Sequence, residues 1–245
     1  MKAYLKKYKW ALCLLVIFAA LCWVYKTHYS TKSYPTVLTY HAIEEKLPEE
    51  TSEENEYLFV RPADLEEQLQ LMTRKGYEFC FASQYEITNK KQVILTLDDG
   101  YEDNYTNLFP LLKKYQAKAT ISVVTGSIGQ PGHLAADQIR EMSDSGLVEF
   151  ASHTVTHPHL TSLDDAALDQ ELQASKRALE EITGKDVQVI AYPYSDYDQR
   201  VCTAAAKYYR FGYIDWPKNY YAQYEIGRTP VRRDITIEQF EALLH

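Results

Sequence analysis

The chain has 245 residues, of which 46% are hydrophobic and 24% are charged, which are values typical of globular proteins. Its formal net charge of −8 argues against a nucleic-acid partner, because such proteins carry basic patches. The length allows one domain with a substantial core, or two small domains.

An apolar run at residues 10–25 (WALCLLVIFAALCWVY) follows four lysines at the N-terminus. It falls somewhat short of the roughly 20 residues of a spanning helix, yet exceeds many signal-peptide cores. No A-x-A cleavage site follows it, and Leu21 before Cys22 is a poor lipobox residue. We therefore predict an uncleaved single-pass membrane anchor at residues 1–26, with the lysines inside and the domain outside the cell. The alternative is a signal peptide whose cleavage releases a secreted domain.

A polar tether at residues 27–35 leads into short apolar runs that alternate with amphipathic stretches. Runs rich in β-branched residues predict strands at 36–40, 92–97, 119–124, 147–152, 187–192, 211–214 and 226–231. Apolar residues at helical spacing predict helices at 62–75, 104–115, 136–145, 163–183, 201–209 and 237–244. The acidic segment 44–56 is predicted to be a surface loop. This alternation predicts an α/β fold with a parallel sheet or barrel, in one domain at 36–245.

Two of the four cysteines lie in the apolar N-terminal run. The other two, Cys80 and Cys202, are far apart and belong to no C-x-x-C pair. They could form one disulfide or remain buried free thiols, and neither is placed like a nucleophile.

Two adjacent carboxylates, Asp98 and Asp99, follow the apolar run at 92–97 directly. They would stand at the carboxyl end of a buried parallel strand, where open α/β sheets and barrels place their chemistry. Two like charges side by side raise one pKa unless a cation or a proton intervenes. A bound metal would resolve this, with one Asp as ligand and the other as base. The alternative is a polar turn that caps the next helix.

The strand at 147–152 leads to His153 and His157, where Pro158 disfavours a helix. Carboxyl ends of barrel strands converge on one face, so these imidazoles can meet the two carboxylates. Two imidazoles and one carboxylate suit zinc or a similar divalent ion, which activates water. Asp99 would complete the ligand set, and Asp98 would accept the proton of the water. A pair of structural histidines is the alternative.

Four segments of this chain resemble motifs of the polysaccharide deacetylases, carbohydrate esterase family four. TLDDG resembles the T-F-D-D-G motif, HTVTH resembles H-[ST]-x-x-H, AYPYS resembles R-x-P-[FY]-G, and IDW resembles the fourth motif. The resemblance implies a distorted (β/α) barrel and metal-dependent removal of acetyl from N-acetylglucosamine in a polymer. The roles that it implies are base for Asp98, metal ligands for Asp99, His153 and His157, oxyanion donor for the Tyr194 amide, and substrate contacts for Tyr192, Pro193 and Trp216.

Two departures from the family pattern concern the base and the acid. Ala191 stands where the family has the arginine that orients the catalytic Asp, and no L-x-H motif follows. The segment IGRTPVRR, with TYHAI near the start, is more similar to cell-surface poly-β-1,6-N-acetylglucosamine deacetylases of biofilm-forming bacteria. His41 then becomes a candidate acid or substrate contact, or else a core histidine, and His159 is a lesser candidate. Arg228 is a candidate to replace the charge of the missing arginine.

We therefore expect a metal-dependent N-deacetylase of an extracellular aminosugar polymer, with poly-β-1,6-N-acetylglucosamine as the first choice of substrate. Peptidoglycan is the rival substrate. A non-catalytic surface carbohydrate-binding protein on the same fold is the hypothesis from another class.

Overall fold

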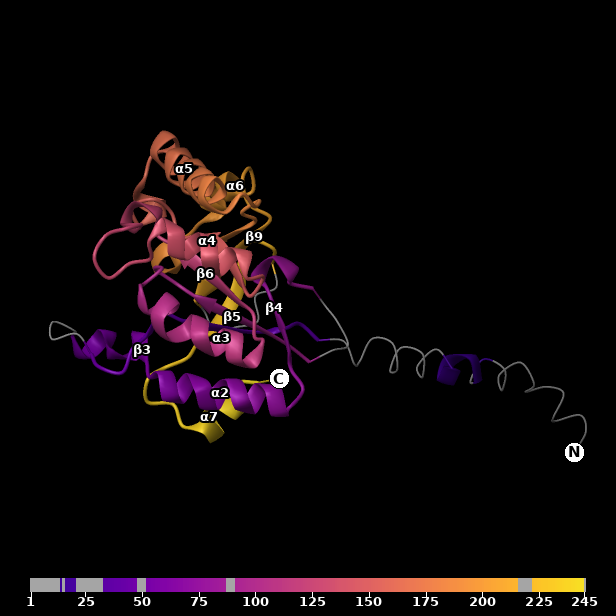
Figure 1. Cartoon of the computed structure of the whole chain (residues 1–245). Helices are drawn as coiled ribbons and strands as arrows, with labels where there is room; N and C mark the ends of the chain where they lie inside the picture. The colour runs from indigo at the N-terminus through magenta and orange to yellow at the C-terminus, as the bar shows by residue number, and fades with distance from the viewer. Residues whose placement is uncertain are drawn as a thin grey trace, which may run out of the picture.

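The computed structural model describes residues 14, 16–20, 33–47, 52–86, 91–215 and 222–244 (Figure 1). Most of the predicted anchor at residues 1–26 lies outside these ranges. Within them, no helix combines the length and the apolar character that crossing a bilayer requires.

Seven parallel strands close into a barrel. β1 pairs with β10 on one side and with β5 on the other, which joins the two edges of the sheet. The ring contains β1 (Thr36–Tyr40), β5 (Gln92–Leu97), β6 (Ala119–Val123), β7 (Val148–Ser152), β8 (Val189–Ala191), β9 (Phe211–Asp215) and β10 (Ile226–Pro230). Leu38 of β1 lies opposite both Leu95 of β5 and Thr229 of β10. The prediction of a barrel of parallel strands is confirmed.

Three short strands lie beside this ring and were not predicted. β4 (Glu78–Cys80) pairs with the first half of β5. β2 (Ala42–Ile43) and β3 (Phe59–Val60) form a separate parallel pair. Cys80, at the end of β4, and Cys202 are both buried and not disulfide-bonded, so the disulfide alternative is wrong.

Six α-helices surround the barrel (Figure 1). They are α2 (Pro62–Arg74), α3 (Phe109–Tyr115), α4 (Ala136–Asp144), α5 (Asp165–Thr183), α6 (Gln199–Ala205) and α7 (Ile237–Glu241). The longest, α5, begins after Asp164, whose carboxylate accepts the Ala167 amide, and ends at Gly184 with a positive φ of 66°. The predicted helix at 104–115 begins as a π-helix, η3 (Asn104–Leu108), before α3.

The core divides into two layers because successive strand residues point to opposite faces. Alternate strand residues, such as Val37, Ile94 and Ala151, form a small cluster inside the ring. The intervening residues, such as Leu38 and Leu95, pack with the helices in a larger cluster outside. The barrel is therefore filled by side chains, and free space remains at its carboxyl end.

The predicted surface loop at 44–56 is wrong in its second half. The chain there forms a 3₁₀ helix, η1 (Glu53–Leu58), which leads into β3. Asn55, Tyr57 and Leu58 of this helix line the cavity at the carboxyl ends of the strands. The segment is thus a wall of that cavity.

Candidate metal centre and active site

A cavity of about 520 Å³ opens where the barrel strands end. We call it the central cavity; its walls include His41 after β1, Asp98 and Asp99 after β5, His153 and His157 after β7, Tyr192, Tyr194 and Ser195 after β8, and Asp215 at the end of β9. The predicted convergence of strand ends therefore brings the two carboxylates and the two histidines into one cavity.

Asp99, His153 and His157 form a compact triangle of donor atoms. Nε2 of His153 lies 3.6 Å from Oδ1 of Asp99, and Nε2 of His157 lies 3.7 Å from the same oxygen. The two Nε2 atoms are 3.1 Å apart. The three side chains come from loops after two different strands, so the fold itself creates this group.

The hydrogen bonding of His153 shows why a cation fits this triangle. Nδ1 of His153 lies 2.8 Å from the carbonyl oxygen of Ala191, which can only accept, so Nδ1 carries the hydrogen. In the neutral ring the lone pair of Nε2 then points to the triangle, where it faces Nε2 of His157. Burial and the neighbouring His153 lower the pKa of His157, which favours a second neutral imidazole. Two neutral imidazoles and a carboxylate suit a divalent ion such as zinc.

Asp98 lies beside the triangle but is held by a different partner. Its two oxygens accept from Nη1 and Nη2 of Arg228 at 2.8 and 2.7 Å, and both side chains are almost fully buried. Nη2 of Arg228 also lies 2.8 Å from Asp215. Arg228 on β10 thus occupies the role that the sequence left open at Ala191.

Opposing influences act on the Asp98 carboxyl. Burial would raise its pKa, but the charge and hydrogen bonds of Arg228, with smaller contributions from His153 and His41, lower the pKa well below its ordinary value. Asp98 is therefore ionised at neutral pH. An ionised carboxylate in a buried position is what a general base requires.

His41 belongs to a second group of potential ligands, together with Asp98 and Asp215, whose nearest donor atoms lie within 4.8 Å of one another. This group already contains Arg228 as its cation. A metal is therefore better placed among Asp99, His153 and His157. His41 remains a half-buried side chain next to the base, facing the central cavity.

Backbone strain concentrates at this site. Six non-glycine residues in the described part of the chain have a positive φ, and five of them adjoin the central cavity: Asp99, Thr154, His157, Tyr194 and Ser195, with φ between 51° and 71°. Such conformations are costly for residues with a Cβ and persist where surrounding structure enforces them. The loops after β5, β7 and β8 are therefore held in fixed, unfavourable shapes around the cavity.

The predicted substrate contacts differ in exposure. The Tyr194 ring is 62% exposed and stacks on His159, with ring centroids 4.2 Å apart, so it offers an aromatic surface at the rim. Tyr192 and Pro193 are buried, and the Tyr192 ring stacks on Tyr197. Trp216 lies outside the described residues.

Sequence reasoning did not single out Asp215, Ser195 or the η1 residues of the central cavity. Asp215 accepts a hydrogen bond from Thr39 at 3.0 Å and lies 2.8 Å from Arg228. Its amide lies 2.6 Å from Oγ of Ser195, which ties β9 to the loop after β8. Asp215 is part of the IDW segment, so that motif was the available signal for it.

Comparisons with known proteins concern the family and the fold. The family model described as polysaccharide deacetylase matches residues 85–211. A crystal structure of a polysaccharide deacetylase from Bacillus cereus superposes with a TM-score of 0.80 at 30% identity, covering 87% of this chain and 70% of that one.

Curated relatives with two different substrate names match this chain. A poly-β-1,6-N-acetyl-D-glucosamine N-deacetylase of Staphylococcus aureus is 30% identical over 118 residues, 43% of this chain and 41% of that protein. The peptidoglycan-N-acetylmuramic acid deacetylase PdaA of Bacillus subtilis is 28% identical over 170 residues, 65% of this chain and 60% of that protein. The chain thus spans less than two thirds of the length of these relatives.

Proposed function

Because the chain belongs to the polysaccharide deacetylase family, we propose that it removes N-acetyl groups from N-acetylglucosamine units of an extracellular polymer, using one divalent metal ion. The observation that carries this proposal is the pairing of the His–His–Asp triangle with a separate buried carboxylate, Asp98, that is held ionised. An amide hydrolase needs both parts, since water must be activated and its proton must be accepted.

Asp99, His153 and His157 would hold the metal ion, with zinc as the first choice and other divalent ions as alternatives. When bound, such an ion supplies Lewis-acid chemistry to the acetamide and to water. The hydrogen bond from His153 to Ala191 fixes the ring so that Nε2 faces the ion position.

Asp98 would take the proton of the attacking water. General-base catalysis contributes typically about 10²–10⁴-fold in rate. Arg228 keeps the carboxylate oriented through two hydrogen bonds, so that the base enters each turnover in one position. Asp215 fixes Arg228 from its other side.

The amide of Tyr194 would donate to the oxygen of the tetrahedral intermediate, and loss of such a donor typically costs about 3–4 kcal/mol. His41 would protonate the leaving amine, because it lies next to Asp98 on the cavity wall. The exposed Tyr194 ring and its neighbour His159 offer a stacking surface to the C–H face of a sugar.

Two polymers are candidates for the substrate. The match to a poly-β-1,6-N-acetyl-D-glucosamine N-deacetylase supports that polymer, which the IGRTPVRR and TYHAI segments also favour. The match to a peptidoglycan deacetylase covers more of this chain and supports the rival. We place the domain outside the cell, where both polymers occur.

An acetate assay with an Asp98→Asn variant tests the proposal. We expect the variant to bind a divalent ion as the wild type does, since Asp98 is outside the ligand triangle, while acetate release falls about 10²–10⁴-fold. Chelation of the wild type should abolish acetate release, and added zinc should restore it. Undiminished turnover of the variant would contradict the base assignment, and polymer binding without any acetate release would favour the carbohydrate-binding hypothesis.

A further inference from the structure

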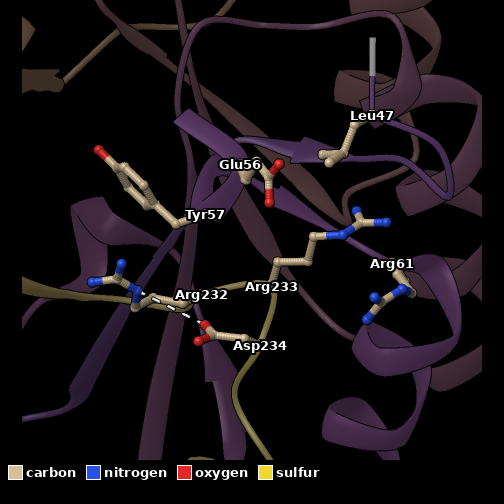
Figure 2. A pocket seen from close by; sticks show the side chains of 7 residues that line it. All are labelled: Leu47, Glu56, Tyr57, Arg61, Arg232, Arg233 and Asp234. Atoms are coloured by element: carbon tan, nitrogen blue, oxygen red, sulfur yellow. Dashed lines mark ion pairs between the residues drawn. The ribbon is translucent and has the colours of Figure 1, made fainter. Parts of the chain in front are cut away.

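A second cavity, of about 480 Å³, lies beyond η1 from the central cavity and is lined by three arginines (Figure 2). We call it the arginine pocket. Arg61 precedes α2, and Arg232 and Arg233 follow β10; the carboxylates of Glu56 and Asp234 and the ring of Tyr57 complete the polar wall. These three guanidinium groups share the wall with two carboxylates, while Asp64, which does not line the pocket, pairs with Arg61.

Arg233 is fixed in the pocket by neutral partners. Nη1 donates to the carbonyl oxygens of Glu44 and Phe59 at 3.2 and 3.1 Å, and Nη2 donates to that of Glu45 at 2.7 Å. These carbonyls hold the guanidinium in place but carry no net charge, and among the described residues no carboxylate forms an ion pair with Arg233. A guanidinium held in this way is preorganised to receive an anion.

The other two arginines have weak acidic partners. Arg61 contacts Asp64 at 3.1 Å, with both side chains more than a third exposed. Arg232 is 3.9 Å from Asp234, and these side chains are 65% and 86% exposed. Pairs so exposed contribute little and exchange readily with water or with another anion. Arg232 also lies over the Tyr57 ring, 5.2 Å from its centroid, which orients it.

Two elements connect the arginine pocket with the central cavity. Tyr57 lines both cavities, so η1 is their common wall. β10 carries Arg228, which holds Asp98, and the chain that follows it carries Arg232 and Arg233. A polymer whose acetylated sugar occupies the central cavity would therefore reach the arginine pocket across η1.

We propose that the arginine pocket binds one acidic substituent, a carboxylate or a phosphate, on a sugar near the one that is deacetylated. The planar guanidinium fork matches both groups through paired N–H donors. The inference rests on the proposed function and narrows its substrate class, because a neutral homopolymer of N-acetylglucosamine lacks such a group.

The test uses two pairs of oligosaccharides that differ in charge. One pair is a β-1,4 tetrasaccharide of alternating N-acetylglucosamine and N-acetylmuramic acid and its methyl ester. The other pair is N-acetylglucosamine tetrasaccharide with and without a 6-phosphate. For the zinc-loaded protein at low salt, we expect the KM of acetate release to be about tenfold lower for the charged member of at least one pair.

An Arg61→Gln/Arg232→Gln double variant should raise KM for the charged member several-fold, with Arg233 retaining part of the preference, and leave KM for the neutral partner unchanged. Arg233 is not replaced in this variant, because its contacts with three backbone carbonyls hold the chain segments together. An Arg140→Gln/Arg177→Gln variant removes the same charge from exposed positions on α4 and α5 and should leave both KM values unchanged.

The outcomes separate the two proposals. Equal KM values within both pairs, or an equal effect of the two double variants, would overturn the arginine pocket as an acid site. A difference in KM within only one of the two pairs identifies the acidic group that the pocket binds as the carboxylate or the phosphate. If no oligosaccharide yields acetate, the proposed function fails. The inference about the pocket is then decided by calorimetry, which compares the affinity of the protein for the tetrasaccharide with N-acetylmuramic acid with its affinity for the methyl ester.

Discussion

Replacement of Arg228 by methionine tests the central electrostatic feature of the site. The change removes the guanidinium and keeps a long apolar side chain, so the barrel core loses little volume. It leaves Asp98 and Asp215 facing each other in a region where Asp98 is almost fully buried. We expect both stability and acetate release to fall.

The magnitude follows from the burial of the pair. Removal of one member of a buried, hydrogen-bonded ion pair typically costs about 3–5 kcal/mol, because the remaining charge keeps its desolvation penalty. With a urea slope of about 2–3 kcal/mol per molar, the urea concentration at the unfolding midpoint should fall by about 1–2.5 M. Burial, no longer opposed by Arg228, also raises the pKa of Asp98, so less of the base is ionised.

Urea unfolding with acetate assays on matched variants measures these effects. Arg228→Lys keeps the charge but not the two-pronged contact, so it should lose only about 1–3 kcal/mol. Adding Asp98→Asn to Arg228→Met should recover part of the lost stability, because the unpaired charge disappears. An Arg228→Met protein within about 1 kcal/mol of the wild type would refute the idea that Arg228 neutralises two carboxylates.

Two further predictions concern the supports of the site. Burial raises the pKa of Asp103 to about 6, although its hydrogen bonds from the Ile43 amide and from Asn104 act to lower the pKa. The protonated carboxyl therefore stabilises the folded state. This stabilisation is complete below the ordinary pKa of 3.8 and is lost as the pH rises through 6. Asp103→Asn keeps an acceptor for the Ile43 amide, so the variant should gain up to about 3 kcal/mol in the free energy of unfolding at pH 7.5 but nothing at pH 3.5. Urea unfolding measures this gain, and an equal gain at both pH values would contradict the prediction. A Cβ added at Gly212 would lie 2.8 Å from Cζ of the buried Tyr192, so Gly212→Ala should lose about 1–3 kcal/mol. Tyr192→Phe in that background should recover part of the loss, and a fully stable Gly212→Ala protein would show that the ring can move.

Local patterns in the sequence predicted the ring of strands well. Strands at 36–40 and 92–97 lie where predicted, because each is a short apolar run between turn residues. β4, at Glu78–Cys80, is too short to display any alternation, so it was missed. The predicted helix at 163–183 begins two residues later, at Asp165, because Asp164 caps it and no local signal in this polar stretch marks that position.

The parts of the site that sequence could not supply depend on long-range register. Asp98 and Arg228 are 130 positions apart, and only the closure of the ring through β1 brings β5 close to β10. The sequence offered Arg228 as a candidate by its charge, yet no spacing connected it with Asp98. The wall of the central cavity that Asn55 and Tyr57 form was not predicted for another reason. An acidic, irregular segment has no periodic pattern that indicates which of its residues line a cavity.

Closure of the ring through β1 also sets an order of events during synthesis. The first barrel strand emerges from the ribosome early, but one of its two neighbours, β10, is translated almost last. Arg228 belongs to that late strand, so a nascent chain that already contains the three proposed metal ligands still lacks the partner of Asp98. The unfinished protein should therefore remain inert until its final strand docks, and chains truncated before residue 226 should acquire neither a closed barrel nor activity.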